Sequence, residues 1–154
     1  MRPRVFQINA SRGGVPKLPI PSADVGAEGI TVDRQRDRRY HGGPLRALCL
    51  FALERIVALQ EEGHPIVPGS TGENITTIGI DPGRLVPGVR LRIGGELEIE
   101  LTSYTVPCRN IAASFIEGES IRISQKLHPG WSRIYARVLV PGSVRTGDSI
   151  AFIE

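Results

Sequence analysis

The chain has 154 residues, enough for a single domain over residues 1–154 with a hydrophobic core of its own. Its 40% hydrophobic and 23% charged residues are typical of globular proteins, and a small, scattered net charge of +3 favours an anionic small ligand and argues against nucleic acid. Two cysteines are too few for a disulfide-stapled secreted domain, and no apolar run reaches the roughly 20 residues of a membrane span, so we expect a cytoplasmic protein without a membrane partner.

The first part of the chain predicts short strands followed by one helix. Residues 5–9 alternate between apolar and polar side chains and predict an opening strand, whereas three prolines keep residues 15–21 extended or turning. Residues 29–33 are a second candidate strand, and residues 46–51 form an apolar stretch short enough for a buried strand. Residues 52–62 carry apolar side chains at helical spacing and end before a glycine, which predicts a helix.

The second part predicts strands and turns. Residues 74–78 read as a short strand, and residues 90–93 and 97–102 read as a hairpin around a pair of glycines. Two further strands are predicted over residues 134–140 and 149–153. So many short strands favour a mostly β fold, a mainly antiparallel β-barrel with one or a few short helices.

Cys108 is the first candidate for a reactive residue. It lies in a polar segment past the predicted strand over residues 97–102, between Pro107 and Arg109. A cation beside a thiol favours the thiolate, which is both a nucleophile and a soft-metal ligand. An ordinary free cysteine with no chemistry is the alternative.

The other candidate ligands form no sequence cluster. Cys49 stands in an apolar stretch and is expected to be a small core residue, and the distance between the two cysteines excludes zinc-finger and thioredoxin motifs. The three histidines are isolated from one another. His41 is followed by two glycines, which would let a ligand approach the backbone closely, although a simple turn would look the same.

Two glycine loops carry polar side chains suited to an anionic ligand. Residues 11–17 bring Arg12 and Lys17 around a flexible turn, and residues 69–74 offer hydroxyls, an acid and the amide of Asn74. Neither loop matches the Walker or the dinucleotide-binding pattern. A phosphate or the edge of a pterin could bind there, and an ordinary solvated loop is the alternative.

These segments, taken in order, resemble the MOSC family, named for the C-terminal domain of molybdenum cofactor sulfurase. The likeness covers essentially the whole chain, and it depends on the joint order of motifs that are individually short. The matching motifs are residues 12–17 (RGGVPK), 41–44 (HGGP), 46–47, 68–69, 72–76, 79, 88, 91–94, 107–108, 130–131, 136–138, 141–144 and 147–148.

The resemblance implies a β-barrel in which Cys108 is the reactive residue. In members that bind molybdenum cofactor, the matching cysteine supplies a thiolate to the metal, and in others it has been proposed to carry sulfur as a persulfide. Pyridoxal phosphate binding is a further association of the family. By the same resemblance, the pterin and phosphate of the cofactor are expected near Arg12, Lys17, His41, Arg46, Asn74 and Arg109.

Three functions follow as alternatives. The first is an oxidoreductase component that reduces small N-hydroxylated substrates, with Cys108 as molybdenum ligand and electrons from a separate electron-transfer protein. The second is a sulfur carrier or transferase that receives a persulfide on Cys108 from a cysteine desulfurase. The third is a non-catalytic module that binds an anionic ligand.

Overall fold

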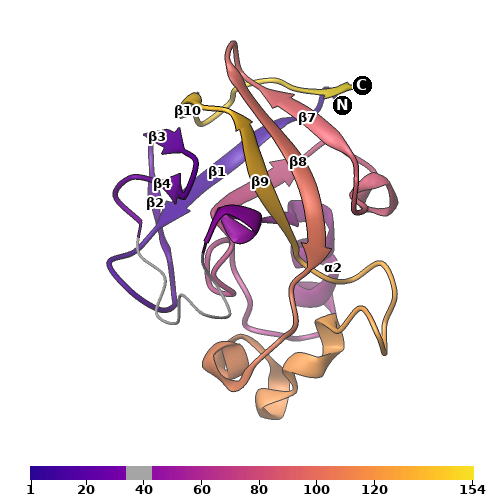
Figure 1. The fold of residues 1–154 in the computed structure, drawn as a ribbon. Coiled ribbons are helices and arrows are strands. Elements are labelled where there is room, and N and C mark those ends of the chain that lie inside the picture. The colour runs from indigo at the N-terminus through magenta and orange to yellow at the C-terminus, as the bar shows by residue number, and fades with distance from the viewer. Residues whose placement is uncertain (34–42) are drawn as a thin grey trace.

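The computed structural model describes residues 1–33 and 43–154, and it confirms a mostly β fold with few helices (Figure 1). The strands are β1 (Arg4–Ala10), β2 (Leu18–Ile20), β3 (Ser22–Gly26), β4 (Gly29–Ile30), β5 (Leu48–Ala52), β6 (Ile75–Ile78), β7 (Arg90–Ile93), β8 (Leu97–Tyr104), β9 (Ile134–Val140), β10 (Gly142–Arg145) and β11 (Ile150–Ile153). The helical elements are α2 (Leu53–Glu61) and the short 3-10 segments η1 (Pro44–Arg46), η2 (Pro82–Arg84), η3 (Arg109–Ser114), η4 (Ile116–Gly118) and η5 (Ser120–Ile123).

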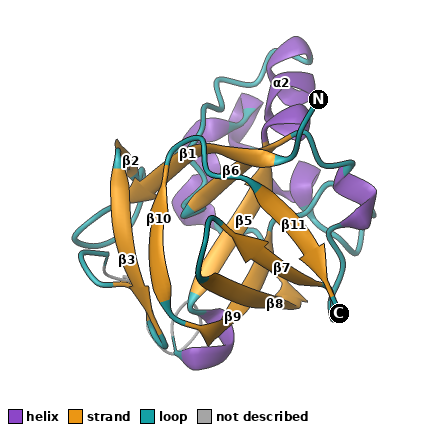
Figure 2. Cartoon of the chain, turned by 90° about the horizontal axis from the view of Figure 1, so that it is seen from above, coloured by secondary structure: helices purple, strands orange, loops and turns teal. Residues whose placement is uncertain are grey.

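Eight strands form one strongly curved sheet in the order β11-β7-β8-β9-β5-β6-β1-β2. Each pair of neighbours in it is antiparallel except β5 and β6, which are parallel and are connected through α2. A smaller sheet has the order β10-β3-β4. Seen from above, the strands curve around one core (Figure 2), and the expectation of mainly antiparallel pairing is confirmed.

The curved sheet is not a closed barrel, but its two ends approach each other. An isolated bridge joins Arg4 on β1 to Ser149, just before β11. Next to it, the Val5 N–H donates to the carbonyl oxygen of Asp148 at 2.9 Å, and the Gly147 N–H donates to that of Val5 at 2.9 Å. The strand-edge groups of β1 near its start are therefore paired by backbone from the far end of the chain.

The alternating strands bury one face as their pattern predicts. In β8, Leu97, Ile99 and Leu101 are buried and belong to the main hydrophobic cluster inside the sheet. On the outer face of the sheet, Arg90 on β7 forms an ion pair with Glu100 on β8. Burying one face and solvating the other fixes the register of these strands, since a slip of one residue would reverse both faces.

The helix α2 covers one end of the sheet and confirms the helix predicted over residues 52–62. Ile56 and Leu59 are fully buried on its inner side, and Gly63 follows its end with φ of +101°. A positive φ costs glycine little, which explains why the helix stops there. The helix packs in a second apolar cluster with the 3-10 segments, formed by Phe51, Ile56, Leu59, Ile66, Ile111, Phe115 and Ile123.

Several boundaries differ from the sequence predictions. The strand expected over residues 29–33 is limited to Gly29–Ile30, and Pro44–Arg46 is a 3-10 turn before β5. Three strands were not predicted: β2, in the stretch expected to be extended or turning, and β3 and β10, which pair with each other although they are far apart in the chain. None of the helices in residues 1–33 and 43–154 has the length and apolar character that crossing a membrane requires.

Candidate functional site

Cys108 opens onto a small pocket at the end of the sheet where β8 finishes and β9 begins. The pocket has a volume of about 60 Å³. That is well below the roughly 300–1,000 Å³ of pockets that enclose a drug-sized ligand, so it encloses only a small group. Its lining comes from five separated segments: Gly14, Val15, Lys17, Cys49, Thr71, Gly72, Thr105, Cys108, Asn110, Ile111, Arg133 and Tyr135.

The β8–β9 ladder places the segment that leads to Cys108 beside Arg133. Tyr104 pairs with Ile134, and the Thr105 N–H donates to the carbonyl oxygen of Arg133 at 3.0 Å, which extends the pairing by one residue. Three residues later Cys108 has extended backbone angles and directly precedes η3 as its N-cap residue. Its side chain is half-buried, so the thiol is held in the pocket and remains accessible to a ligand.

Arg133 is a buried cation with an unused hydrogen-bonding edge. The residue is only 5% exposed, and its Nη1 donates to the carbonyl oxygen of Thr71 at 2.6 Å. Its Nε and Nη2 are buried and have no hydrogen-bond partner among the residues that the structure describes. Buried polar groups are nearly always paired, so these two donors require an explanation.

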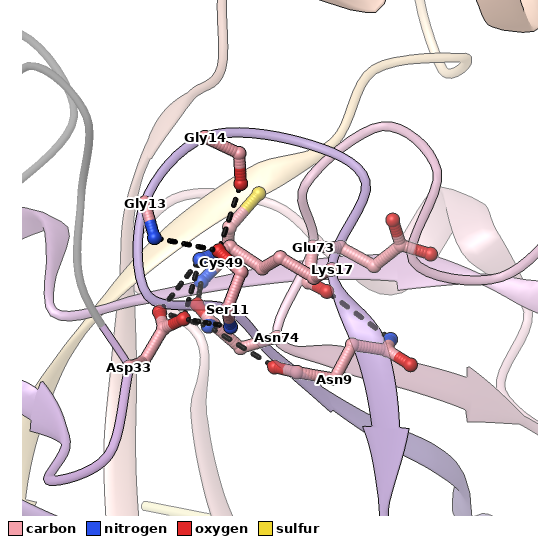
Figure 3. A network of polar contacts seen from close by, with 9 residues as sticks. All are labelled: Asn9, Ser11, Gly13, Gly14, Lys17, Asp33, Cys49, Glu73 and Asn74. Atoms are coloured by element: carbon pink, nitrogen blue, oxygen red, sulfur yellow. Dashed lines mark hydrogen bonds and ion pairs between the residues drawn. The ribbon is translucent and has the colours of Figure 1, made fainter.

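Lys17 is the second buried cation of the pocket, and Asp33 neutralises it. The Lys17 Nζ lies 2.6 Å and 2.7 Å from the two carboxylate oxygens of Asp33, which also accept hydrogen bonds from the Ser11 N–H and the Asn74 Nδ2 (Figure 3). Such charge-assisted bonds hold the ammonium group in one position. The pocket therefore has one compensated cation, Lys17, and no ion pair to Arg133 in the described part of the chain.

Asn74 connects this ion pair to the pocket wall. Its side-chain oxygen accepts a hydrogen bond from the Cys49 N–H at 2.9 Å, while its Nδ2 donates to Asp33 (Figure 3). Asn74 is fully buried and does not line the pocket itself. Its contacts in this structure position Cys49 and Asp33.

A buried carboxyl group supports the loop that carries Thr71. Glu73 accepts hydrogen bonds from the Gly69 N–H at 3.0 Å and from the hydroxyls of Thr71 and Thr76 at 3.0 Å and 3.1 Å. Burial raises the pKa of Glu73 above its ordinary value, and these hydrogen bonds counteract part of that effect. The loop is thus fixed from inside the molecule, which fixes the carbonyl group that Arg133 contacts.

The inner wall of the pocket is formed by groups that resist ionisation. Burial raises the pKa of the Cys49 thiol, whose sulfur lies 3.5 Å from the Thr105 hydroxyl. Burial also raises the pKa of Tyr135 to about 12. Desolvation disfavours the thiolate and phenolate forms of these side chains. Cys49 is buried, as the sequence predicted, and Cys108 is the more accessible of the two thiols.

Three of the remaining predicted ligands, Arg12, Arg46 and Arg109, do not line the pocket. Arg12 and Arg109 are exposed at the surface, and the Arg46 guanidinium lies 5.7 Å from the centre of the Tyr135 ring. His41 lies outside the described residues. For these four residues, cofactor binding stays a prediction.

Sequence reasoning missed two residues that shape the site. Asp33 was expected only as the last residue of the candidate strand over residues 29–33, and Arg133 directly precedes the strand predicted over residues 134–140. The role of each residue depends on a partner that is distant in sequence: Asp33 pairs with Lys17, and Arg133 donates to the carbonyl oxygen of Thr71. An arginine directly before an apolar strand was the one available signal.

Comparison with known proteins gives a consistent result. A family model described as MOSC domain matches residues 37–151. YflK of Bacillus subtilis (strain 168) is 28% identical over 143 residues, covering 92% of this chain and 63% of YflK. YiiM of Escherichia coli (strain K12) is 29% identical over 131 residues, covering 82% of this chain and 57% of YiiM. The chain thus spans less than two thirds of the length of either relative.

A solved structure shares the fold. The crystal structure of YiiM from Geobacillus stearothermophilus superposes with a TM-score of 0.77 at 22% identity. The superposition covers 99% of this chain and 75% of that YiiM chain. It confirms the curved, mostly β architecture.

Proposed function

Because this chain belongs to the MOSC domain family, we propose that it binds molybdenum cofactor, with Cys108 as the protein ligand of the metal, as a component of an oxidoreductase. The observation that supports this most is the position of Cys108. Its half-exposed thiol shares a small pocket with the buried cations Lys17 and Arg133. A thiolate is a soft ligand, and molybdenum in this cofactor is already bound by dithiolene sulfurs.

The charges of the pocket also fit the cofactor. Molybdenum cofactor is anionic through its phosphate and its sulfur ligands, and Arg133 presents two buried donors without a partner among the described residues. Lys17 adds a second positive group, although Asp33 offsets its charge. Because the pocket is small, most of a bound pterin would extend beyond it toward the surface.

In this proposal the residues of the chain hold and orient the cofactor, and the cofactor carries out the reaction. Bound cofactor would supply the two-electron reduction of an N–OH group to N–H, with water as the second product and electrons from a separate electron-transfer protein. Cys108 would hold the metal, and Arg133 would balance negative charge in a partly desolvated site. The Asp33–Lys17 pair and Asn74 would keep the loop of residues 11–17 against the pocket.

Metal analysis tests the proposal directly. Protein purified from a host that makes molybdenum cofactor should contain molybdenum and release a fluorescent oxidised pterin. The same protein from a host that cannot make the cofactor is the matched control for background metal. Cys108→Ser should lose the molybdenum while keeping the urea midpoint of the wild type. Folded wild-type protein without molybdenum or pterin from the competent host would contradict the proposal.

A sulfur carrier is the second candidate, favoured by the accessibility of Cys108 in contrast to the buried Cys49. A cysteine desulfurase would present a persulfide, its terminal sulfur would bond to the Cys108 thiolate, and the donor cysteine would leave as a thiolate. Intact mass should then rise by one sulfur atom in the wild type and not in Cys108→Ala. Unchanged wild-type mass after exposure to a loaded desulfurase would exclude this function.

A further inference from the structure

We infer that the pocket is a binding site for an oxyanion, and that Arg133 is the residue that recognises it. The unused edge of the guanidinium carries this inference. Arg133 is only 5% exposed. Its Nε and Nη2 are inaccessible to solvent and have no hydrogen-bond partner among the described residues. This same side chain lines the pocket, so a ligand that enters the pocket would lie beside the guanidinium group.

The geometry of the guanidinium selects the type of ligand. Nε–H and Nη2–H are parallel donors on one edge of a planar group, and this edge matches two oxygens of a phosphate, sulfate or carboxylate. The opposite nitrogen, Nη1, donates to the carbonyl oxygen of Thr71 at 2.6 Å and thus fixes the orientation of the plane. Neutral ligands would satisfy the two donors but would leave the charge of Arg133 uncompensated.

The charged groups around Arg133 favour a bound anion, rather than another side chain of the protein, as the partner of its free donors. Lys17 is already paired with Asp33, with both side chains almost fully buried. Glu73 is engaged by the Gly69 N–H and by two threonine hydroxyls. Neither of these buried carboxyl groups makes an ion pair with Arg133, so an anion from outside is the simplest compensation for its charge.

The size of the pocket limits what can enter. A volume of about 60 Å³ suits a group of a few heavy atoms and not an entire cofactor. The oxyanion is therefore either a free inorganic ion or the terminal phosphate of a larger ligand whose remainder lies outside. Cys108 and Asn110 line the same pocket, so either ligand would sit near the thiol.

This inference does not depend on the proposed function, because it concerns the protein without metal. Sulfate is the probe, added to protein from a host without molybdenum cofactor while chloride keeps the ionic strength constant. The melting temperature should rise with sulfate and saturate. Sulfate also stabilises proteins in general by exclusion from their surface, and that contribution rises without saturating.

Variants of two arginines separate these contributions. Arg133→Met should keep only the non-saturating rise of the melting temperature. Arg133→Lys should bind sulfate at least tenfold more weakly than the wild type, because lysine lacks the two parallel N–H donors. Arg137→Met is the matched control. Arg137 pairs with Glu100 on the outer face of the sheet, and its removal should leave the saturation curve unchanged. Equal saturating behaviour in Arg133→Met and the wild type would overturn the inference.

A direct measurement covers the case in which Arg133→Met does not fold. The nitrogen-15 signal of the Arg133 Nε–H group in the wild-type protein should shift on addition of sulfate and reach a plateau. The absence of any shift at the concentration that saturates the melting curve would overturn the inference.

Two phosphate probes distinguish the possible sources of the anion. Inorganic phosphate and glycerol phosphate are compared by their ability to displace sulfate. Tighter binding of glycerol phosphate would support the site and identify the oxyanion as the end of a larger ligand. Tighter binding of inorganic phosphate would support a site for a free ion, and displacement by neither would count against the site.

Discussion

The Lys17 ammonium group lies 2.6 Å and 2.7 Å from the two carboxylate oxygens of Asp33, and both side chains are about 95% buried. This pair joins the glycine loop of residues 11–17 to the segment that follows β4. Two charges removed from water stabilise each other only while both are present. The contact therefore predicts a large effect when one partner is neutralised.

Asp33→Asn should lower the free energy of unfolding by about 3–5 kcal/mol, because it leaves the Lys17 ammonium group buried without its counter-ion. Urea denaturation measures this value. The matched control is Glu98→Gln, which makes the same change in an exposed pair with Arg92 and should cost about 0–1 kcal/mol. A similar cost for both variants would show that the Lys17–Asp33 pair is not effectively buried.

Gly69→Ala should destabilise the protein by about 2–5 kcal/mol, through left-handed backbone strain and overpacking together. Gly69 has φ of +85°, and a β-carbon there would overlap the carbonyl oxygen of Lys17 and lie 3.1 Å from the Asn9 side chain. Gly88 has φ of +93° with open space around it. Gly88→Ala should therefore show the backbone strain alone, about 1–2 kcal/mol. Chemical denaturation of both variants gives the comparison, and equal losses would contradict the steric argument.

Alkylation should distinguish the two thiols in the native protein. Cys108 is half-exposed in the pocket, whereas Cys49 is buried and burial raises its pKa. Iodoacetamide at neutral pH should therefore modify Cys108 and leave Cys49 unmodified until urea unfolds the chain. Peptide mass spectrometry locates the label, and Cys108→Ser should remain unlabelled when folded. Rapid labelling of Cys49 in the native state would contradict its burial.

The contribution of Glu73 to the stability of the protein should fall as pH rises above the ordinary pKa of this residue. Burial raises this pKa above about 4.5, so the folded state retains a proton that the unfolded chain releases. In that window the unfolded state binds fewer protons, and the free energy of unfolding decreases with pH by at most about 1.4 kcal/mol per pH unit. Above the raised pKa this contribution no longer changes.

Glu73→Gln should remove this decrease, because an amide does not titrate in the window. Urea denaturation of the wild type and the variant between about pH 4.5 and about pH 8 measures the difference, which should shift in favour of the variant as pH rises. Parallel profiles would show that Glu73 is ionised in the folded protein throughout the range.

The spacing and alternation of apolar residues predicted the helix and the strands whose residues alternate between the core and the solvent. Helix α2 and the hairpin of β7 and β8 lie where spacing and alternation placed them, since each has one buried and one solvated face. Strand β9 also lies where it was predicted, although its first three residues are all buried. Strands β3 and β10 were missed. They are short, and they pair with each other through Val25 and Gly142, more than 100 residues apart, which no local periodicity reveals.

The site was predictable in part for the same reason. Cys108 and Lys17 were recognised from the motifs around them, and both line the pocket. Arg133 was not, because its side chain acquires its role only when β9 aligns with β8 and brings it opposite Thr71. Asn74 was expected to contact a cofactor, and its amide instead contacts Cys49 and Asp33 in this structure.

The bridge between Arg4 and Ser149 has a consequence for synthesis on the ribosome. A nascent chain shorter than about 149 residues cannot supply the backbone that pairs with Val5, so one side of β1 near its start stays open while most of the sheet is already present. Open strand edges attract other chains. We therefore expect a late closure between distant segments, before which this strand edge is open to pairing with other chains.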